Sequence, residues 1–244
     1  MTDEFENISY QINPPLALVV VSQETTLNRL NLATINELKE VFTAIKQNNT
    51  IQVVIFTGTG KEAFISGIDE QELSNLSPQA TKTYAEQGQQ LVLQIAQLGK
   101  PVIAAINGVA LDIGLELAAV CSLRIAADTA QFGLPAVKTG KIPAFGGSRR
   151  LTQLIGLGQT VELLLTGELI NAQKAYEIGL INQVTRPIEL FSSAKEIAQK
   201  ISNNSPIAIK YALESIFNGL EMPLEEALLL EATLFGLCNV VKEQ

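Results

Sequence analysis

A stretch around Glu116 combines the residue types needed to move a proton beside a developing negative charge. An apolar segment at 102–106 runs into the turn Asn107-Gly108, and a helix is expected from about Asp112, with Glu116 in its first turn. Backbone N–H groups at the start of a helix have no partners within it and lie at the positive end of its dipole. They are therefore suited to stabilise an oxyanion that forms during a reaction.

Glu116 is flanked in sequence by apolar residues, among them Leu115 and Leu117. Desolvation raises the pKa of a carboxyl group, which brings it toward the range that proton transfer near neutral pH needs. A structural interpretation fits equally well, in which Asp112 caps the helix and Glu116 only complements its dipole. This segment alone does not separate the two interpretations.

A second turn could supply a further N–H donor. In the segment 64–69, Gly67 permits a sharp turn and Asp69 is expected to cap the next helix, which leaves the N–H of Ile68 free to point into a cleft. Such turns are common connectors and carry little information alone. Paired with the N–H of Ile113, however, Ile68 would complete a two-donor oxyanion hole, each donor stabilising an enolate by roughly 3–4 kcal/mol.

Composition excludes several other chemistries. The 244 residues include no His, so Ser-His-Asp and Cys-His hydrolases and imidazole metal sites are ruled out. A net charge of −8 argues against nucleic-acid binding. No apolar run reaches the roughly 20 residues of a membrane span, and the N-terminus does not resemble a signal peptide. Cys121 and Cys238 lack metal-ligand spacing, so we expect buried thiols, no metal and a reducing, cytoplasmic location.

The elements that must position these residues alternate between strands and helices over the first part of the chain. Strands are predicted at Leu16 to Ser22, Gln52 to Thr57, Val102 to Ile106 and Leu123 to Ala127, with helices at Thr34 to Lys46, at Pro78 to Leu98 and after Asp112. This alternation predicts right-handed crossovers and a largely parallel α/β arrangement. Helical spacing then dominates in Gly147 to Ile155, Gln159 to Leu165, Ala172 to Ile178, Leu190 to Ile201, Pro206 to Phe217 and Leu224 to Leu237.

Motifs along nearly the whole chain resemble the crotonase (enoyl-CoA hydratase/isomerase) family. They are the turn 64–69, the segment from Ile106 through Glu116, Gln131-Phe132-Gly133-Leu134-Pro135, 146–151, Thr166-Gly167 with 172–184, and 231–238. The resemblance implies an α/β fold in which residues 1–185 form a crotonase-like spiral of ββα units. Residues 186–244 would then form a C-terminal helical region that mediates trimerisation.

The resemblance also implies roles for particular residues. It places the two oxyanion N–H donors on Ile68 and Ile113, and it matches Glu116 to one of the two catalytic glutamates of the hydratases. Candidates for contact with the acyl group or CoA are Leu27, Ser66, Gly67, Gly114, Pro135, Ala136 and Ala144. No metal and no cofactor are implied, because the CoA or phosphopantetheine thioester is the substrate.

This chain departs from the family pattern at several of these positions. Ala136 stands where hydratases carry the second glutamate, and Ala144 where dienoyl-CoA isomerases and a dehalogenase carry an aspartate. The usual Gly-Gly-Gly before the catalytic glutamate is replaced by Asp112-Ile113-Gly114, and Gln71 replaces a lysine near the CoA phosphates. The sequence also stops at Gln244, where the family usually continues into a last helix that helps to cover CoA.

These departures shape the expected reaction. Hydration uses two carboxylates, whereas one suffices to move a proton between the α and γ carbons or to protonate an enolate left by decarboxylation. We therefore expect an enzyme acting through an enolate on a CoA or acyl-carrier-protein thioester, with isomerisation or decarboxylation favoured over hydration. Single-glutamate isomerases of the family usually keep the residue that is Ala136 here, so Glu116 would take an unusual role.

A protein that keeps the oxyanion scaffold without chemistry is the alternative: an acyl-thioester-binding or subunit protein. The expected partners are an acyl thioester, further copies of the chain in a homotrimer or hexamer, and an acyl carrier protein as a further candidate. Neither a nucleic acid nor a membrane is expected as a partner.

Overall fold

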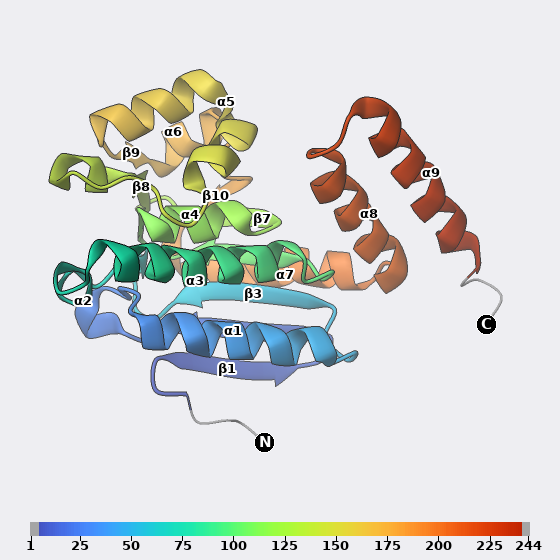
Figure 1. Ribbon diagram of the computed structural model, residues 1–244. Coiled ribbons are helices and arrows are strands. Elements are labelled where there is room, and N and C mark those ends of the chain that lie inside the picture. Colours follow the sequence, from blue (N-terminus) through green and yellow to red (C-terminus); the bar gives the residue numbers. More distant parts are fainter. Residues whose placement is uncertain (1–4, 241–244) are drawn as a thin grey trace.

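The computed structural model describes residues 5–240, and successive strand–strand–helix units form its core (Figure 1). The first unit is β3 (Val53–Gly58), β4 (Ala63–Ile65) and the helices α2 (Glu70–Ser74) and α3 (Pro78–Ala96). The second is β5 (Val102–Ile106), β6 (Val109–Leu111) and α4 (Ile113–Val120). The third is β7 (Leu123–Ala127), β8 (Gln131–Gly133), the 3₁₀ helix η2 (Pro135–Thr139) and α5 (Gly147–Thr166). The expected spiral of ββα units is confirmed.

Each unit contributes one strand to each of two sheets. The larger sheet has the order β1 (Ile8–Asn13), β2 (Leu16–Val21), β3, β5, β7 and β10 (Gln183–Thr185), and only β1 runs antiparallel to its neighbour. The smaller sheet has the order β4, β6, β8 and β9 (Ile170–Asn171), with β4, β6 and β8 parallel. The carboxyl ends of β4, β6 and β8 therefore lie at one edge, and the turns that follow these strands meet there.

Continuous apolar sequence explains why the central strands are buried on both faces. All five residues of β5 are buried, as expected for a strand of a covered parallel sheet. On one face, Ala194 and Ala198 of α7 (Leu190–Ser202) pack against strand residues such as Ile103. On the other face, α1 (Leu32–Gln47) and α3 cover the residues that alternate with these. The alanines on α7 allow its backbone to lie close to the sheet.

The long elements follow the sequence prediction closely. The predicted strands at Leu16 to Ser22 and Gln52 to Thr57 are β2 and β3, and the predicted helix at Pro78 to Leu98 is α3. The helical segments predicted at Gly147 to Ile155 and Gln159 to Leu165 are the two halves of α5, separated by a kink at Gly156, where φ is +77° and the backbone is not helical. β1 was not predicted, because it is an edge strand with three exposed residues and a weak apolar signal.

The C-terminal helices differ in how they join the rest of the molecule. The short helix α6 (Ala172–Glu177) packs against β8, β9 and β10, and α7 packs against the larger sheet. The 3₁₀ helices η1 (Glu24–Thr26) and η3 (Pro187–Glu189) have no buried residues. In contrast, α8 (Pro206–Gly219) and α9 (Leu224–Val240) pair with each other and stand apart from the sheets in Figure 1. No residue of α8 is buried, and the main contacts of α8 are with α9, so the pair leaves apolar side chains such as Ile216 exposed.

Two further observations concern the expectations from composition. Cys121 is buried, as expected, whereas Cys238 is only half-buried, because it lies on α9, away from the core. Both thiols are free. Among residues 5–240, no helix combines the length and apolar character needed to cross a lipid bilayer.

Candidate active site

Three turns at one edge of the smaller sheet bring the predicted site residues together. The turn after β4 carries Ile68, the turn after β6 carries Asp112 and Ile113, and the turn after β8 carries Pro135 and Ala136. The strands are aligned in parallel register, with Ile65 opposite Ala110 and Leu111 opposite Gly133. These register positions place the three turns side by side.

The N–H groups of Ile68 and Ile113 are available for a ligand in residues 5–240. Leu30 N donates to Gly67 O at 2.9 Å, and Asp69 N donates to Leu30 O at 2.9 Å. These two hydrogen bonds flank Ile68 and do not use its N–H. Ile113 is the first residue of α4, where the N–H has no partner within the helix. Gly67 has a φ of +129°, so the turn depends on glycine. Asp69 caps α2 as predicted, since its Oδ1 accepts from Gln71 N at 2.9 Å.

Glu116 lies beside Ile113, and its carboxylate points away from α4 toward the start of α5. Its Oε2 accepts from Phe145 N at 2.8 Å and Gly147 N at 2.6 Å, and its Oε1 accepts from Ala144 N at 3.2 Å. The side chain is 1% exposed. The hydrogen-bond partners of Glu116 therefore belong to the segment that leads into α5 and not to the first turn of its own helix.

Burial raises the pKa of Glu116 from 4.5 to about 7. The three N–H donors lower this pKa, and the nearby Asp112 raises it. The donors stabilise the charged form, and the Asp112 carboxylate disfavours it. Gly147 is required for this contact, because a Cβ there would lie 2.6 Å from Glu116 Cγ. The desolvated carboxyl group expected from the sequence is present, with a pKa suited to proton transfer.

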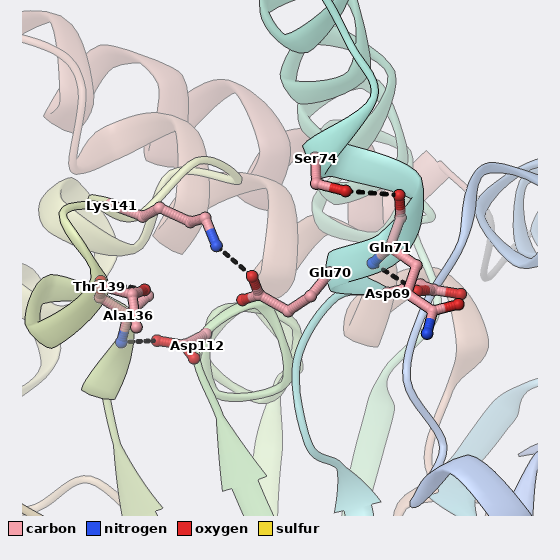
Figure 2. Close-up of polar contacts among 8 residues, drawn as sticks. All are labelled: Asp69, Glu70, Gln71, Ser74, Asp112, Ala136, Thr139 and Lys141. Atoms are coloured by element: carbon pink, nitrogen blue, oxygen red, sulfur yellow. Dashed lines mark hydrogen bonds and ion pairs between the residues drawn. The ribbon is translucent and has the colours of Figure 1, made fainter.

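Asp112 does not cap α4, contrary to the prediction. Its φ of +49° and ψ of −118° turn the side chain away from the helix, and it makes no capping hydrogen bond. Instead, Oδ1 accepts from Ala136 N at 3.0 Å (Figure 2). Its other oxygen faces the first turn, since a Cβ on Gly67 would lie 3.8 Å from Asp112 Oδ2.

Charged side chains surround the Asp112 carboxylate, which is only partly buried. Figure 2 shows Glu70 of α2 reaching toward Lys141, which follows η2, and the two form an ion pair near Asp112. Burial raises the pKa of Asp112, and the nearby Glu70 raises it further, whereas the Ala136 N–H and Lys141 lower it. No feature of the sequence alone indicates this cluster, since Glu70, Asp112 and Lys141 are 29 or more positions apart.

The remaining candidates for acyl or CoA contact have different surroundings. Leu27 is exposed, has a φ of +55° and lines a cavity of about 320 Å³ together with Arg29 and Asp69. Ser66 Oγ is buried and has no hydrogen-bond partner in residues 5–240. Gly114 is buried, and a Cβ there would lie 2.0 Å from Ile65 O. The absence of a side chain at Gly114 therefore allows α4 to pack closely on β4.

Pro135, Ala136 and Ala144 border the two carboxylates. Pro135 and Ala136 begin η2, where the Ala136 N–H is bonded to Asp112. The Ala144 N–H is bonded to Glu116. The two alanines, which replace acidic residues of the family that the sequence resembles, thus each present a backbone donor to a carboxylate from the segment 112–116.

A second cavity, of about 520 Å³, lies between α3, the start of α5 and α8. Its lining includes Phe145, whose N–H donates to Glu116, but not Glu116, Ile68 or Ile113. The N–H pair and the two carboxylates therefore define the candidate active site, and this cavity lies behind it. Such a site can polarise a carbonyl group and move protons beside it.

The chain is similar to known proteins along nearly its whole length. Residues 11–243 match the family model described as "Enoyl-CoA hydratase/isomerase". The chain is 37% identical to "Crotonyl-CoA hydratase" of Syntrophomonas wolfei over 98% of this chain and 92% of that protein. It is 36% identical to "Short-chain-enoyl-CoA hydratase" of Clostridium acetobutylicum over 99% of this chain and 92% of that protein. A crystal structure of an enoyl-CoA hydratase from Bacillus anthracis superposes with a TM-score of 0.92 at 38% identity, covering 95% of this chain and 90% of that one.

Proposed function

The chain belongs to the enoyl-CoA hydratase/isomerase family, and from this premise we propose that it hydrates an enoyl-CoA thioester through an enolate. The observation that carries the proposal is the pair of available N–H groups, on Ile68 and Ile113, beside the buried carboxyl group of Glu116. The thioester oxygen binds between the two N–H groups. Because the negative charge of the enolate develops on that oxygen, these donors act on the transition state.

Glu116 is the group that delivers a proton to the α carbon of the enolate. Its pKa of about 7 leaves a large share of the side chain protonated near neutral pH. Oε1 accepts only the contact from Ala144, at 3.2 Å, so this oxygen can carry the proton while Oε2 keeps both of its donors. The N–H donors fix the carboxyl group in place, and this orientation favours transfer to one carbon.

Hydration replaces the isomerisation or decarboxylation that the sequence suggested. The similar proteins from Syntrophomonas wolfei and Clostridium acetobutylicum are both named as hydratases. Isomerisation was expected because Ala136 lacks the carboxylate that hydratases carry at this position. Hydration is still possible if a different residue supplies a second carboxylate. CoA is the carrier that these names support, and an acyl carrier protein remains a carrier to test.

Loss of the ultraviolet absorbance of the conjugated crotonyl thioester tests this proposal. We expect the wild-type protein to hydrate crotonyl-CoA with a kcat on the order of 1 s⁻¹ or above. Crotonyl-pantetheine and a crotonyl-loaded acyl carrier protein, run in parallel, distinguish the carriers. Binding of crotonyl-CoA without any turnover would overturn the proposal in favour of a non-catalytic thioester-binding protein.

A further inference from the structure

We infer that Asp112 supplies the second carboxylate of the active site and activates the water that adds to the β carbon, an inference that rests on the proposed hydration. Hydration needs a group that accepts the proton of water, and Ala136 has no side chain that can do so. The carboxylate of Asp112 lies 3.0 Å from the backbone nitrogen of Ala136. It is therefore next to the position whose side chain is missing.

The position of Asp112 relative to the oxyanion donors supports this role. Asp112 directly precedes Ile113, and its Oδ2 faces Gly67, which directly precedes Ile68. A thioester oxygen held by the two N–H groups thus brings the acyl carbons beside this carboxylate. Glu116 is fully buried, whereas Asp112 is partly exposed, so water reaches Asp112 from solvent.

The bonds of Asp112 leave one oxygen free for chemistry. Oδ1 accepts from Ala136 N, and no hydrogen bond to Oδ2 is formed within residues 5–240. The backbone at φ +49° and ψ −118° is a conformation that costs a non-glycine residue energy. That conformation points the carboxylate toward η2 and the β4 turn, rather than toward the unpaired N–H groups of α4 that an ordinary cap would bind.

Asp112 and Glu116 differ mainly in how deeply each carboxyl group is buried. Glu70 faces Asp112 from α2, and Lys141 faces it from the segment after η2. Glu116 lies one helical turn along α4. Glu70 and Lys141 are paired with each other, so their effects on Asp112 largely oppose. Glu116 is 1% exposed, whereas Asp112 is only partly buried, and different environments of this kind assign one carboxyl group as acid and the other as base.

The Asp112 carboxylate accepts a proton from water while the water oxygen forms a bond to the β carbon. The electron pair of the C=C bond moves to form the enolate, whose oxygen is bound by the N–H groups of Ile68 and Ile113. The enolate collapses as the α carbon takes the proton of Glu116. The proton gained by Asp112 and that lost by Glu116 are restored by exchange with solvent.

Substitution Asp112→Asn tests this role, because asparagine keeps an oxygen that can accept from Ala136 N but cannot accept a proton from water. We expect kcat for crotonyl-CoA hydration to fall by about 10²–10⁴-fold, with KM and the melting temperature little changed. The pH profile of kcat should also lose its acid limb. Asp128→Asn, at an exposed aspartate after β7, is the matched control and should keep wild-type kinetics.

A relocated carboxylate gives a second, independent test. Asp112→Gly relaxes the backbone and should be inactive, whereas Asp112→Gly combined with Ala136→Glu should regain at least tenfold in kcat. This pair decides the matter even if Asp112→Asn folds poorly. Wild-type kcat in Asp112→Asn, or no gain from Ala136→Glu, would overturn the role of Asp112 while leaving hydration in place. Failure of the wild-type protein to hydrate any enoyl thioester would instead overturn the proposed function, and this inference with it.

Discussion

The carboxyl group of Glu116 is held in a place that disfavours its charge, and that placement has consequences for stability as well as for catalysis. Desolvation outweighs three N–H donors, so the pKa in the folded protein is about 7. When folding raises the pKa of a group, the group contributes its full stabilisation of the folded state only at a pH below its pKa in the unfolded chain. This stabilisation is lost as the pH rises through the folded pKa.

The free energy of unfolding should therefore fall between pH 4.5 and about 7 in the wild-type protein by more than in Glu116→Gln. Because the pKa of Glu116 moves from 4.5 to about 7, this change in the free energy of unfolding is at most roughly 3 kcal/mol. Urea unfolding across this pH range measures both proteins, and the difference between their slopes isolates Glu116 from Asp112 and other groups. Parallel pH curves would show that Glu116 is charged at neutral pH and would remove the acid role given to it.

Catalysis should depend on the same group. Glu116→Gln is expected to lower kcat for hydration by about 10²–10⁴-fold while crotonyl-CoA still binds, because the amide cannot deliver the proton. In the wild-type protein, kcat should decline as the pH rises above about 7, where Glu116 loses its proton. Glu162→Gln on the exposed face of α5 is the control for the chemical change. A Glu116→Gln variant with wild-type kcat would exclude Glu116 from the mechanism.

The sequence predicts one carboxylate of the site, that of Glu116, but not the role of the other, that of Asp112. Apolar neighbours of Glu116 and the expected helix start indicated a desolvated carboxyl group beside N–H donors. The role of Asp112 could not be predicted in the same way, because it depends on a φ of +49° and on a partner, Ala136, far along the chain. An aspartate before a helix usually caps it, and only the backbone geometry shows that this one does not.

At the scale of elements, the close approach of α4 to the start of α5 positions Glu116. Gly147 permits this approach, and Gly147→Ala would place a Cβ 2.6 Å from Glu116 Cγ. We expect a loss of about 1–3 kcal/mol in the free energy of unfolding, typical of overpacking, together with reduced kcat. Gly158→Ala in the same helix has nothing within 4 Å of the added Cβ and should be neutral or slightly stabilising. Equal effects of the two substitutions on stability would contradict this account of the contact.

Long helices and buried strands could be predicted from apolar periodicity, whereas the short strands could not. β4, β6 and β8 have three residues each, too few to show a period, and their pairing depends on contacts between separate units. These strands nevertheless align the three turns of the active site. The order of the motifs along the chain, which resembles a known family, supplied the information that periodicity lacked.

At the scale of the whole molecule, the paired helices α8 and α9 leave a large apolar surface uncovered. Leu228, Leu229 and Phe235 are 56%, 69% and 72% exposed. A monomeric protein rarely exposes such a surface, and a second copy of the chain is the partner expected from the sequence. The helices are joined to the core through contacts such as Arg149 with Glu221, 3.0 Å apart and exposed, which contribute little.

We therefore expect the protein to sediment as a trimer or hexamer at micromolar concentration. Removal of the residues from Pro223 onward deletes α9 and should dissociate or aggregate it, because the apolar face of α8 then loses its cover. Analytical ultracentrifugation of the full chain and the shortened one makes the comparison. A full chain that is monomeric and stably folded would contradict the prediction.

Deuterium incorporation from solvent reports directly on proton transfer to the α carbon of the enolate. Crotonyl-CoA is incubated with the wild-type protein in D₂O, and the product is analysed by NMR. We expect the wild-type protein to form a 3-hydroxyacyl thioester with one deuterium at the α carbon. The Glu116→Gln variant should not form this product. Crotonyl-CoA that binds to the wild-type protein but gains neither a hydroxyl group nor an α deuterium would contradict this proton transfer.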